Sequence, residues 1–205
     1  MTRTLDTVVF DLGGVLIDWD PRHLYRQLFD DEDEMERFLA TVCTLGWHGR
    51  FDAGRPIAEG IQELVDRHPE LESLIRAYAD RWQDMFAGEV PGAARVLEEL
   101  DDGGVRLFAI TNWPHETFPA ARERFGFLSR FRGIVVSGAE GVTKPDPRLF
   151  GVLVERHGVD PAGSLFVDDA PANVEAAARL GFATERFTDA ASFRGRLVRE
   201  GLLPR

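Results

Sequence analysis

Lys144 is the only lysine in a chain whose lysine and arginine residues together number 24. A lysine ammonium is a compact point charge, whereas the arginine guanidinium is broad, planar and forked, so the two do not replace each other in a crowded site. A stray lysine in an arginine-rich composition is the alternative explanation. The lysine stands in the segment VTKPDP (142–147), and it predicts a site only if other reactive side chains accompany it.

Five further polar side chains directly follow short apolar runs that predict buried strands. They are Asp11, Thr111, Asn112, Asp168 and Asp169. Lys144 lies in the loop after another such run, just before a predicted helix. Ligands of an open parallel sheet bind outside the carboxyl ends of its strands, so we expect all these residues to share one crevice.

The residues of this set suit the transfer of a phosphoryl group. Asp11 and the Asp168-Asp169 pair offer the hard oxygen ligands that Mg²⁺ prefers. Carboxylates packed so closely repel one another and need a cation, which Mg²⁺ and Lys144 would supply. The hydroxyl of Thr111 and the Lys144 ammonium suit phosphate oxygens, and a metal-clamped carboxylate can attack phosphorus to form an aspartyl phosphate. Taken singly, each aspartate and Thr111 could instead cap a helix or form a turn.

The elements that must position these residues alternate between strand and helix. Strands are predicted at 7–10, 105–110, 133–136 and 164–167, with a weaker one at 182–185. The helices predicted between the later strands are 114–125, 147–157 and 171–180. Such alternation is typical of a parallel sheet covered on both faces. The sequence therefore predicts an α/β fold, with a Rossmann-like parallel sheet flanked by helices.

Residues 18–88 differ, because they hold amphipathic helical stretches and no convincing strand. We expect a small α-helical domain at 18–88, inserted into a catalytic core made of 1–17 and 89–205. Within it, the stretch 47–55 interrupts the helical pattern with glycines and carries many functional groups. It is interpreted either as a loop that covers the crevice and contacts the substrate, or as a helix connection with Trp47 and Phe51 packed inward.

Composition excludes several classes of protein. The net charge of −11 and the pI near 4.9 argue against nucleic-acid or anionic-membrane binding, which needs a basic face. The single cysteine, Cys43, excludes an internal disulfide and a cysteine zinc cluster. No apolar run approaches the ~18 residues of a membrane span, and the N-terminus has no apolar signal core, so we expect a cytoplasmic protein. The sequence does not indicate an oligomeric state.

Four segments carry a resemblance to a known family. They are VVFDLGGV at Asp11, ITN at Thr111, TKPDP at Lys144 and FVDDAPAN at Asp168. In type and order they resemble the motifs of the haloacid dehalogenase superfamily of hydrolases, and the resemblance runs from residue 7 to about 185. It implies a Rossmann-like core with a helical cap at the place of 18–88. Most members are phosphatases, and the most similar variety acts on small sugar phosphates or nucleotides.

The resemblance implies catalytic roles for four residues. Asp11 would be the nucleophile, and Lys144 would stabilise both that carboxylate and the charge of the transferring phosphoryl group. Thr111 would bind the phosphoryl group together with the backbone amide of Asn112. The implied substrate is a small phosphorylated metabolite.

The resemblance also implies a Mg²⁺ site. Its ligands would be Asp11, Asp168, Asp169 and the backbone carbonyl of Gly13, with Asn173 orienting them from behind. Family phosphatases usually carry a second aspartate, a general acid and base, where this chain has Gly13. Such a group contributes about 10²–10⁴-fold to the rate. Another acid must substitute, with Asp18, Asp20 and His48 as candidates, or the enzyme is slow or needs a good leaving group.

Three functions therefore compete. The leading expectation is Mg²⁺-dependent hydrolysis of a small phosphomonoester through an aspartyl phosphate on Asp11. The second is 2-haloacid dehalogenation, in which Asp11 attacks carbon; that branch works without Mg²⁺, usually has an aromatic residue in place of Gly13, and leaves the Asp168-Asp169 pair unexplained. The third is a catalytically weak or non-catalytic member that binds a phosphorylated ligand or a protein partner, as the Gly13 departure suggests.

Overall fold

A five-stranded parallel sheet with the order β5-β4-β1-β6-β7 forms the centre of the molecule. The computed structural model describes residues 4–205, so the first three residues of the expected core lie outside the described part. The strands are β1 (Thr7–Phe10), β4 (Arg106–Thr111), β5 (Gly133–Val136), β6 (Ser164–Asp168) and β7 (Ala183–Arg186). Each lies within one residue of its predicted bounds, and the α/β prediction is confirmed.

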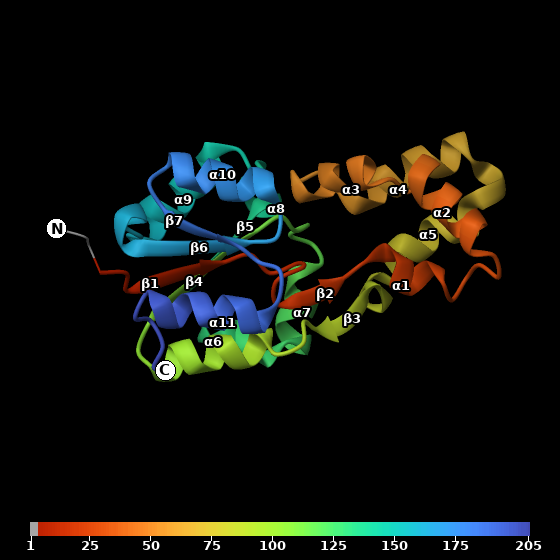
Figure 1. The fold of residues 1–205 in the computed structure, drawn as a ribbon. Coiled ribbons are helices and arrows are strands. Elements are labelled where there is room, and N and C mark those ends of the chain that lie inside the picture. Colours follow the sequence, from red (N-terminus) through yellow and green to blue (C-terminus); the bar gives the residue numbers. More distant parts are fainter. Residues whose placement is uncertain (1–3) are drawn as a thin grey trace.

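Helices cover both faces of this sheet (Figure 1). One face carries α9 (Pro147–His157) and α10 (Pro171–Arg179), and the other carries α6 (Ala93–Asp102) and α11 (Ala190–Arg199). The central strand β1 is buried along its length, and its residues alternate between two apolar clusters. Val9 shares a cluster with Leu149 of α9, whereas Val8 shares one with Leu97 of α6 and Leu197 of α11. This two-sided burial explains the continuous apolar sequence of the strand.

Shorter elements connect these helices and strands. They are α7 (Phe118–Arg124), η3 (Gly126–Arg130), α8 (Ser137–Glu140) and η4 (Pro161–Gly163). The helix predicted from residue 114 begins only at Phe118, because the chain first makes a turn in which the Thr117 hydroxyl donates to the carbonyl of Pro114 at 3.2 Å.

Residues 17–89, named the insert here, leave the sheet after β1 and return before α6. They start and end in a two-stranded antiparallel ribbon of β2 (Ile17–Trp19) and β3 (Phe86–Glu89), so the expectation of a strand-free segment at 18–88 is wrong at its ends. Between the strands lie α1 (Pro21–Tyr25), α2 (Glu32–Thr41), α3 (Leu45–Asp52), α4 (Ile57–Arg67), η1 (Pro69–Leu71), α5 (Glu72–Asp80) and η2 (Trp82–Met85). The division into a separate domain stays a prediction.

Helix α3 occupies most of the stretch in which glycines interrupt the helical pattern. Thr44 caps it by accepting a hydrogen bond from the backbone N–H of Trp47 at 3.1 Å. Trp47 and Phe51 are buried, and the Trp47 indole donates to the carbonyl of Gly60 on α4 at 3.2 Å. Packing against α4 thus offsets the poor helix propensity of the glycines. The inward-packed interpretation is correct for these two aromatic residues.

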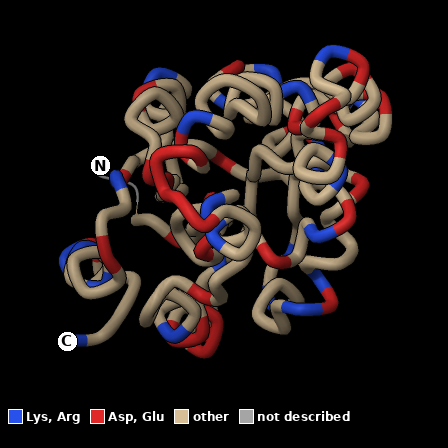
Figure 2. Tube along the Cα trace, turned by 90° about the vertical axis from the view of Figure 1, so that its right-hand side faces the viewer, with Lys and Arg blue, Asp and Glu red and all other residues tan. Residues whose placement is uncertain are grey.

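The outer helices carry acidic and basic residues intermixed along the chain (Figure 2). The acidic run at 30–34 contributes the start of α2, where the Asp31 carboxylate accepts from the backbone N–H of Glu34 at 2.9 Å. Within residues 4–205, no helix has both the length and the apolar character that crossing a membrane requires.

Candidate active site

The carboxyl ends of the three central strands hold the predicted reactive residues. Because β1 lies between β4 and β6, Asp11, Thr111 and Asp168 stand at the ends of neighbouring strands on one edge of the sheet. The backbone N–H of Asp11 donates to the carbonyl of Val167 at 2.9 Å, which extends the pairing of β1 with β6 as far as the aspartate. Residues that are distant in the sequence are thus neighbours in space.

Lys144 lies at the centre of this edge. Its Nζ is 2.9 Å from Oδ1 of Asp11 and 2.7 Å from Oδ2 of Asp168, and its side chain is fully buried. Burial alone lowers the pKa of the Lys144 ammonium, but the charges of the two carboxylates outweigh it and raise the pKa above its usual value. The ammonium therefore stays protonated, and the single lysine is a buried residue of the site and not an incidental surface residue.

Asn112 holds the loop that carries the lysine. Its Oδ1 accepts from the backbone N–H of Lys144 at 2.8 Å, and its Nδ2 donates to the carbonyl of Lys144 at 3.0 Å. The Asn112 side chain is therefore a positioning group. Thr111 is only 1% exposed. The expected contacts of Thr111 and of the Asn112 backbone amide with a phosphoryl group stay predictions.

Asp168 is fully buried, and both of its carboxylate oxygens accept hydrogen bonds. The donors are Lys144 Nζ at 2.7 Å, the backbone N–H of Ala170 at 2.9 Å and Nδ2 of Asn173 at 3.0 and 3.1 Å. Asp168 thus anchors the lysine, and Asn173 orients Asp168. This is the geometry that the expected supporting role of Asn173 requires.

Asp11, Asp168 and Asp169 each offer an oxygen within 4.8 Å of the others. Burial raises the pKa of Asp11 against the opposing charge of Lys144, and burial with the charge of Asp168 raises the pKa of Asp169. Lys144 and the N–H of Leu12, at 2.7 Å, both donate to Oδ1 of Asp11, whereas no described residue donates to its Oδ2. The negative charge of these carboxylates exceeds what the nearby hydrogen-bond donors neutralise. Such a group of hard oxygen atoms fits a divalent cation such as Mg²⁺.

Two glycines that follow Asp11 after one intervening residue have different surroundings. Gly14 has a φ of +71°, and a Cβ there would lie 2.7 Å from Oδ2 of Asp169, so the approach of that carboxylate requires glycine. A Cβ at Gly13, in contrast, would meet nothing within 4 Å. Gly13 therefore leaves open space beside Asp11, and a ligand role for its carbonyl stays a prediction.

A cavity of about 260 Å³ lies over these strand ends. The core lines it with Asp11, Gly13, Gly14, Asn112, Trp113, Pro114 and Asp169. The insert lines it with Trp19, His48, Asp52 and Trp82. The cavity is thus closed by both halves of the molecule, with carboxylates on the core side and mostly aromatic rings on the insert side.

His48 and Asp52 stand one turn apart on α3 and face each other. Nε2 of His48 is 3.3 Å from Oδ1 of Asp52, without the alignment of a hydrogen bond, and its Nδ1 is 2.8 Å from the Tyr78 hydroxyl. Burial lowers the pKa of His48 to about 4 and raises that of Asp52 to about 7, the charge of Lys144 partly opposing the latter. At neutral pH the imidazole is therefore uncharged.

Aromatic rings hold the His48 imidazole in place. The ring of Trp19 stacks on it with a centroid separation of 4.7 Å, and that of Trp82 stacks at 5.7 Å. The two tryptophan rings are themselves 5.9 Å apart. Two tryptophan rings, from β2 and η2, thus fix the orientation of the histidine on α3.

Two of the proposed substitute acids lie outside the cavity. Asp20 caps α1 by accepting from the N–H of Arg22 at 2.8 Å, and Asp18 contacts Nε2 of His23 at 3.0 Å. Of the three candidates, only His48 lines the cavity. Sequence reasoning did not single out Asp52. The available signal was its spacing of four residues from His48, which places both side chains on one face of a helix.

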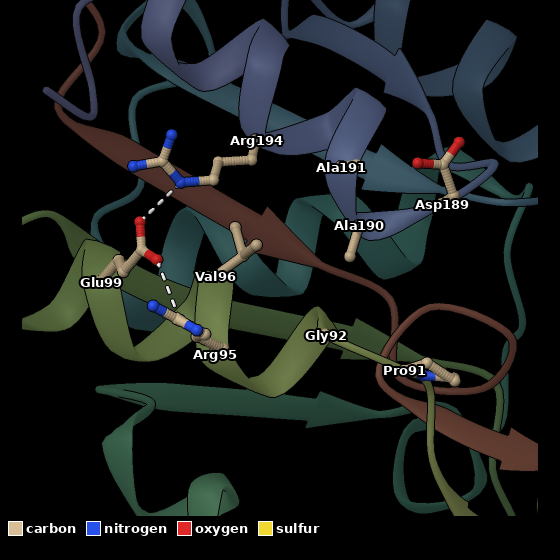
Figure 3. Close-up of a pocket in the computed structure, with 9 residues that line it drawn as sticks. All are labelled: Pro91, Gly92, Arg95, Val96, Glu99, Asp189, Ala190, Ala191 and Arg194. Carbon is tan, nitrogen blue, oxygen red and sulfur yellow. Dashed lines mark hydrogen bonds and ion pairs between the residues drawn. The ribbon is translucent and has the colours of Figure 1, made fainter. Parts of the chain in front are cut away.

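A second hollow of about 580 Å³ lies between α6 and α11 (Figure 3). Its charged groups already have partners: Glu99 accepts from Arg194 at 2.8 Å and lies 3.5 Å from Nε of Arg95, and Asp189 accepts from the N–H of Ser192 at 2.8 Å. It holds no cluster of carboxylates comparable to the strand-end trio among the described residues. The candidate active site is therefore the cavity at the strand ends.

Comparison with known proteins points to the same chemistry. A sequence model of haloacid dehalogenase-like hydrolases matches residues 5–181. A sesquiterpene phosphatase of Aspergillus oryzae is 28% identical over 196 residues, which cover 92% of this chain and 93% of that protein.

Solved structures share the fold. A haloacid dehalogenase family enzyme of Bacteroides thetaiotaomicron, crystallised as a magnesium complex, is 20% identical with a TM-score of 0.72, covering 96% of this chain and all of that one. An L-2-haloacid dehalogenase of Xanthobacter autotrophicus, with chloropropionic acid covalently bound, is 21% identical with a TM-score of 0.65, covering 98% and 85%. At these identities the likeness concerns the fold alone.

Proposed function

The chain belongs to the haloacid dehalogenase-like hydrolases, and we propose that it is a Mg²⁺-dependent phosphatase that hydrolyses a small phosphomonoester through an aspartyl phosphate on Asp11. One observation carries this proposal. Lys144 and three carboxylates gather at the end of the central strand, and two of these carboxylates, Asp11 and Asp169, line a cavity of about 260 Å³. The phosphatase name of the Aspergillus relative supports the same reaction class.

The carboxylate trio fits Mg²⁺, with Asp11, Asp169 and the Gly13 carbonyl as ligands and Asp168 as a direct or water-mediated one. When bound, the ion would neutralise these carboxylates and the oxygens of the phosphate. Asp11 has one oxygen fixed by Lys144 and Leu12, and its other oxygen is without a donor among the described residues. This arrangement holds the carboxylate still for attack on phosphorus.

Lys144 has two functions in this proposal. Its ammonium keeps Asp11 oriented, and it supplies positive charge where the phosphoryl group passes from the substrate to the aspartate. Asp168, fully buried and bound by Asn173, holds the ammonium in that place. Thr111 and the backbone amide of Asn112 bind the phosphoryl oxygens.

The decisive experiment measures hydrolysis of p-nitrophenyl phosphate and of a panel of phosphorylated metabolites, with and without Mg²⁺. We expect turnover that requires the metal. Asp11→Asn keeps the size of the side chain but removes the nucleophile, so it is expected to abolish turnover while the variant still unfolds cooperatively. Wild-type turnover by Asp11→Asn would exclude the covalent mechanism.

The same experiment separates the two other functions. A dehalogenase would release chloride from 2-chloropropionate without metal, and the carboxylate trio gives no reason to expect this. A non-catalytic member would bind phosphate esters without releasing inorganic phosphate. Either result would replace the proposed phosphatase.

A further inference from the structure

Among the described residues, the core side of the cavity offers no acidic side chain other than the carboxylates of Asp11 and Asp169. The side chain that could protonate a leaving group beside Asp11 is absent at Gly13, where a Cβ would meet nothing within 4 Å. The carboxylates of Asp11 and Asp169 belong to the proposed cation site. An acid for the reaction must therefore come from the insert, whose residues form the opposite wall.

Asp52 is the carboxyl group on that wall. Its Oδ1 is buried without a hydrogen-bond partner in the described chain, so the remaining side-chain exposure of 11% belongs to its other atoms. The residue lines the same cavity as Asp11, so we infer that its exposed side-chain atoms face that space. A carboxyl group that is 7% exposed, with no hydrogen-bond partner for Oδ1 among the described residues, is costly to bury, and this cost calls for a role.

The neighbours of Asp52 hold it in a defined orientation. The Tyr78 hydroxyl, whose pKa burial raises well above the usual value, keeps its proton and lies 2.8 Å from Nδ1 of the neutral His48. When this hydroxyl donates to Nδ1, the ring proton of His48 is on Nε2, which faces Oδ1 of Asp52 at 3.3 Å. This sequence of contacts leaves Oδ2 as the oxygen that carries the transferable proton.

Two contacts dock the end of α3 onto the core. The Ser137 hydroxyl, from α8, donates to the backbone carbonyl of Asp52 at 2.6 Å and accepts from the N–H of Trp113 at 2.9 Å. Gly54 comes so close that a Cβ there would lie 3.0 Å from the carbonyl of Gly138. Figure 1 shows α3 reaching toward α8. Asp52 is therefore positioned by the core itself.

We propose that Asp52 is the general acid and base of the phosphatase reaction, supplied by the insert in place of a side chain at Gly13 and positioned by the docking of α3 onto the core. This inference rests on the proposed function. His48 is not itself the acid, because burial keeps its imidazole neutral. Burial also raises the pKa of the Asp52 carboxyl to about 7, so a large fraction of it is protonated in neutral solution.

The proton follows a closed cycle. An oxygen of Asp11 forms a bond to phosphorus as the bond from phosphorus to the alcohol oxygen breaks. The departing alcohol oxygen takes the proton of Asp52. In the second step the Asp52 carboxylate removes a proton from water, whose oxygen attacks the aspartyl phosphate. Inorganic phosphate leaves, Asp11 is restored as a carboxylate, and Asp52 is again protonated.

The test compares two leaving groups in Asp52→Asn. An alkyl phosphate such as glycerol phosphate needs a proton on its departing oxygen, whereas p-nitrophenolate leaves without one. We expect kcat/KM for the alkyl ester to fall about 10²–10⁴-fold and kcat/KM for p-nitrophenyl phosphate to stay near that of the wild type. Because the second step also loses its base, kcat for the aryl ester should fall and a burst of p-nitrophenol should appear.

Asp18→Asn is the matched control, since Asp18 is an acidic residue of the insert that does not line the cavity. It should leave both values of kcat/KM unchanged. An equal loss of kcat/KM for both esters in Asp52→Asn, or no loss for the alkyl ester, would overturn the assignment. Absence of Mg²⁺-dependent turnover in the wild type would instead reject the proposed function itself.

A measurement on the wild type covers the case in which Asp52→Asn does not fold. The groups that face Asp52 are His48 on α3, Tyr78 on α5, Lys144 before α9, and Asp11 and Asp169 across the cavity. All of them act on both substrates alike. Above about pH 7, kcat/KM for the alkyl ester should therefore fall relative to kcat/KM for the aryl ester. Superimposable pH profiles would contradict the role of Asp52.

Discussion

At the scale of single residues, the central observation is a fully buried ammonium between two carboxylates. Lys144 is 2.9 Å from Asp11 and 2.7 Å from Asp168, in a space closed on all sides by protein. A guanidinium has the same charge but spreads it over a wide plane. The site therefore depends on the shape of the cation as much as on its sign.

We predict that Lys144→Arg lowers kcat/KM for p-nitrophenyl phosphate at least about 100-fold, as small misplacements near the reacting groups do. Arg148→Lys, the reverse exchange at a side chain that is 77% exposed, is the control and should leave activity unchanged. Steady-state kinetics at saturating Mg²⁺ measures both variants. Comparable rates for Lys144→Arg and the wild type would mean that the shape of the cation is unimportant.

The reactive residues of the core were predictable because each follows a strand, and strand ends of a parallel sheet meet at one edge. Asp52 was not, because nothing in its immediate sequence distinguishes it from a surface aspartate. Its burial comes from the packing of α3 between the core and α5. The candidates Asp18 and Asp20 failed for a related reason: nearness to Asp11 in sequence does not direct a side chain into the cavity.

At the scale of elements, α3 depends on the shape of its neighbour α4. A Cβ at Gly60 of α4 would lie 2.3 Å from the ring of Phe51, whereas a Cβ at Gly49 of α3 would meet nothing within 4 Å. The same residue type thus serves close packing at one position and has no packing role at the other.

We predict that Gly60→Ala lowers the free energy of unfolding by about 1–3 kcal/mol, because Phe51 must move. Gly49→Ala, the matched control, should raise it by about 0.5–1 kcal/mol through better helix propensity. Urea unfolding followed by circular dichroism measures both. Equal effects of the two substitutions would show that Phe51 does not restrict residue 60.

Elements differ in how far the sequence specified them. The five strands of the sheet were predicted to within one residue. The three central strands are buried and largely apolar on both faces, whereas the edge strand β7 is only partly buried and was the weaker prediction. The ribbon strands β2 and β3 have only three and four residues and no clear periodicity, and they exist because they pair with each other. Helix α3 forms in spite of the low helix propensity of its glycines, because tertiary packing outweighs propensity.

At the scale of the whole molecule, stability is linked to pH through the buried carboxyl groups. Burial raises the pKa of Asp52 from 3.8 to about 7, and it also raises that of Asp11 and Asp169. The folded state therefore binds these protons more tightly than the unfolded chain does. This contribution to stability is complete below about pH 4 and is lost as the pH rises through 7.

We predict that Mg²⁺ raises the melting temperature of the protein, and more at pH 8 than at pH 5, because the cation binds the ionised carboxylates. At a concentration of about 100 times Kd, the stabilisation should approach about 2.7 kcal/mol. Asp169→Asn should remove most of the effect. Thermal melts at both pH values, with and without MgCl₂, test this, and a shift that is independent of pH or retained in the variant would count against the cation site.

The antiparallel ribbon has a consequence for selectivity. Both passages of the chain between the core and the insert run side by side through β2 and β3, so the insert is joined to the core at one place. Some phosphate esters have an alcohol group too large for the C-terminal end of α3 to dock beside Ser137. With such a substrate, Asp52 would not reach the leaving-group oxygen. Such a molecule would occupy the enzyme and remain uncleaved, so discrimination among substrates would be expressed in turnover more than in affinity.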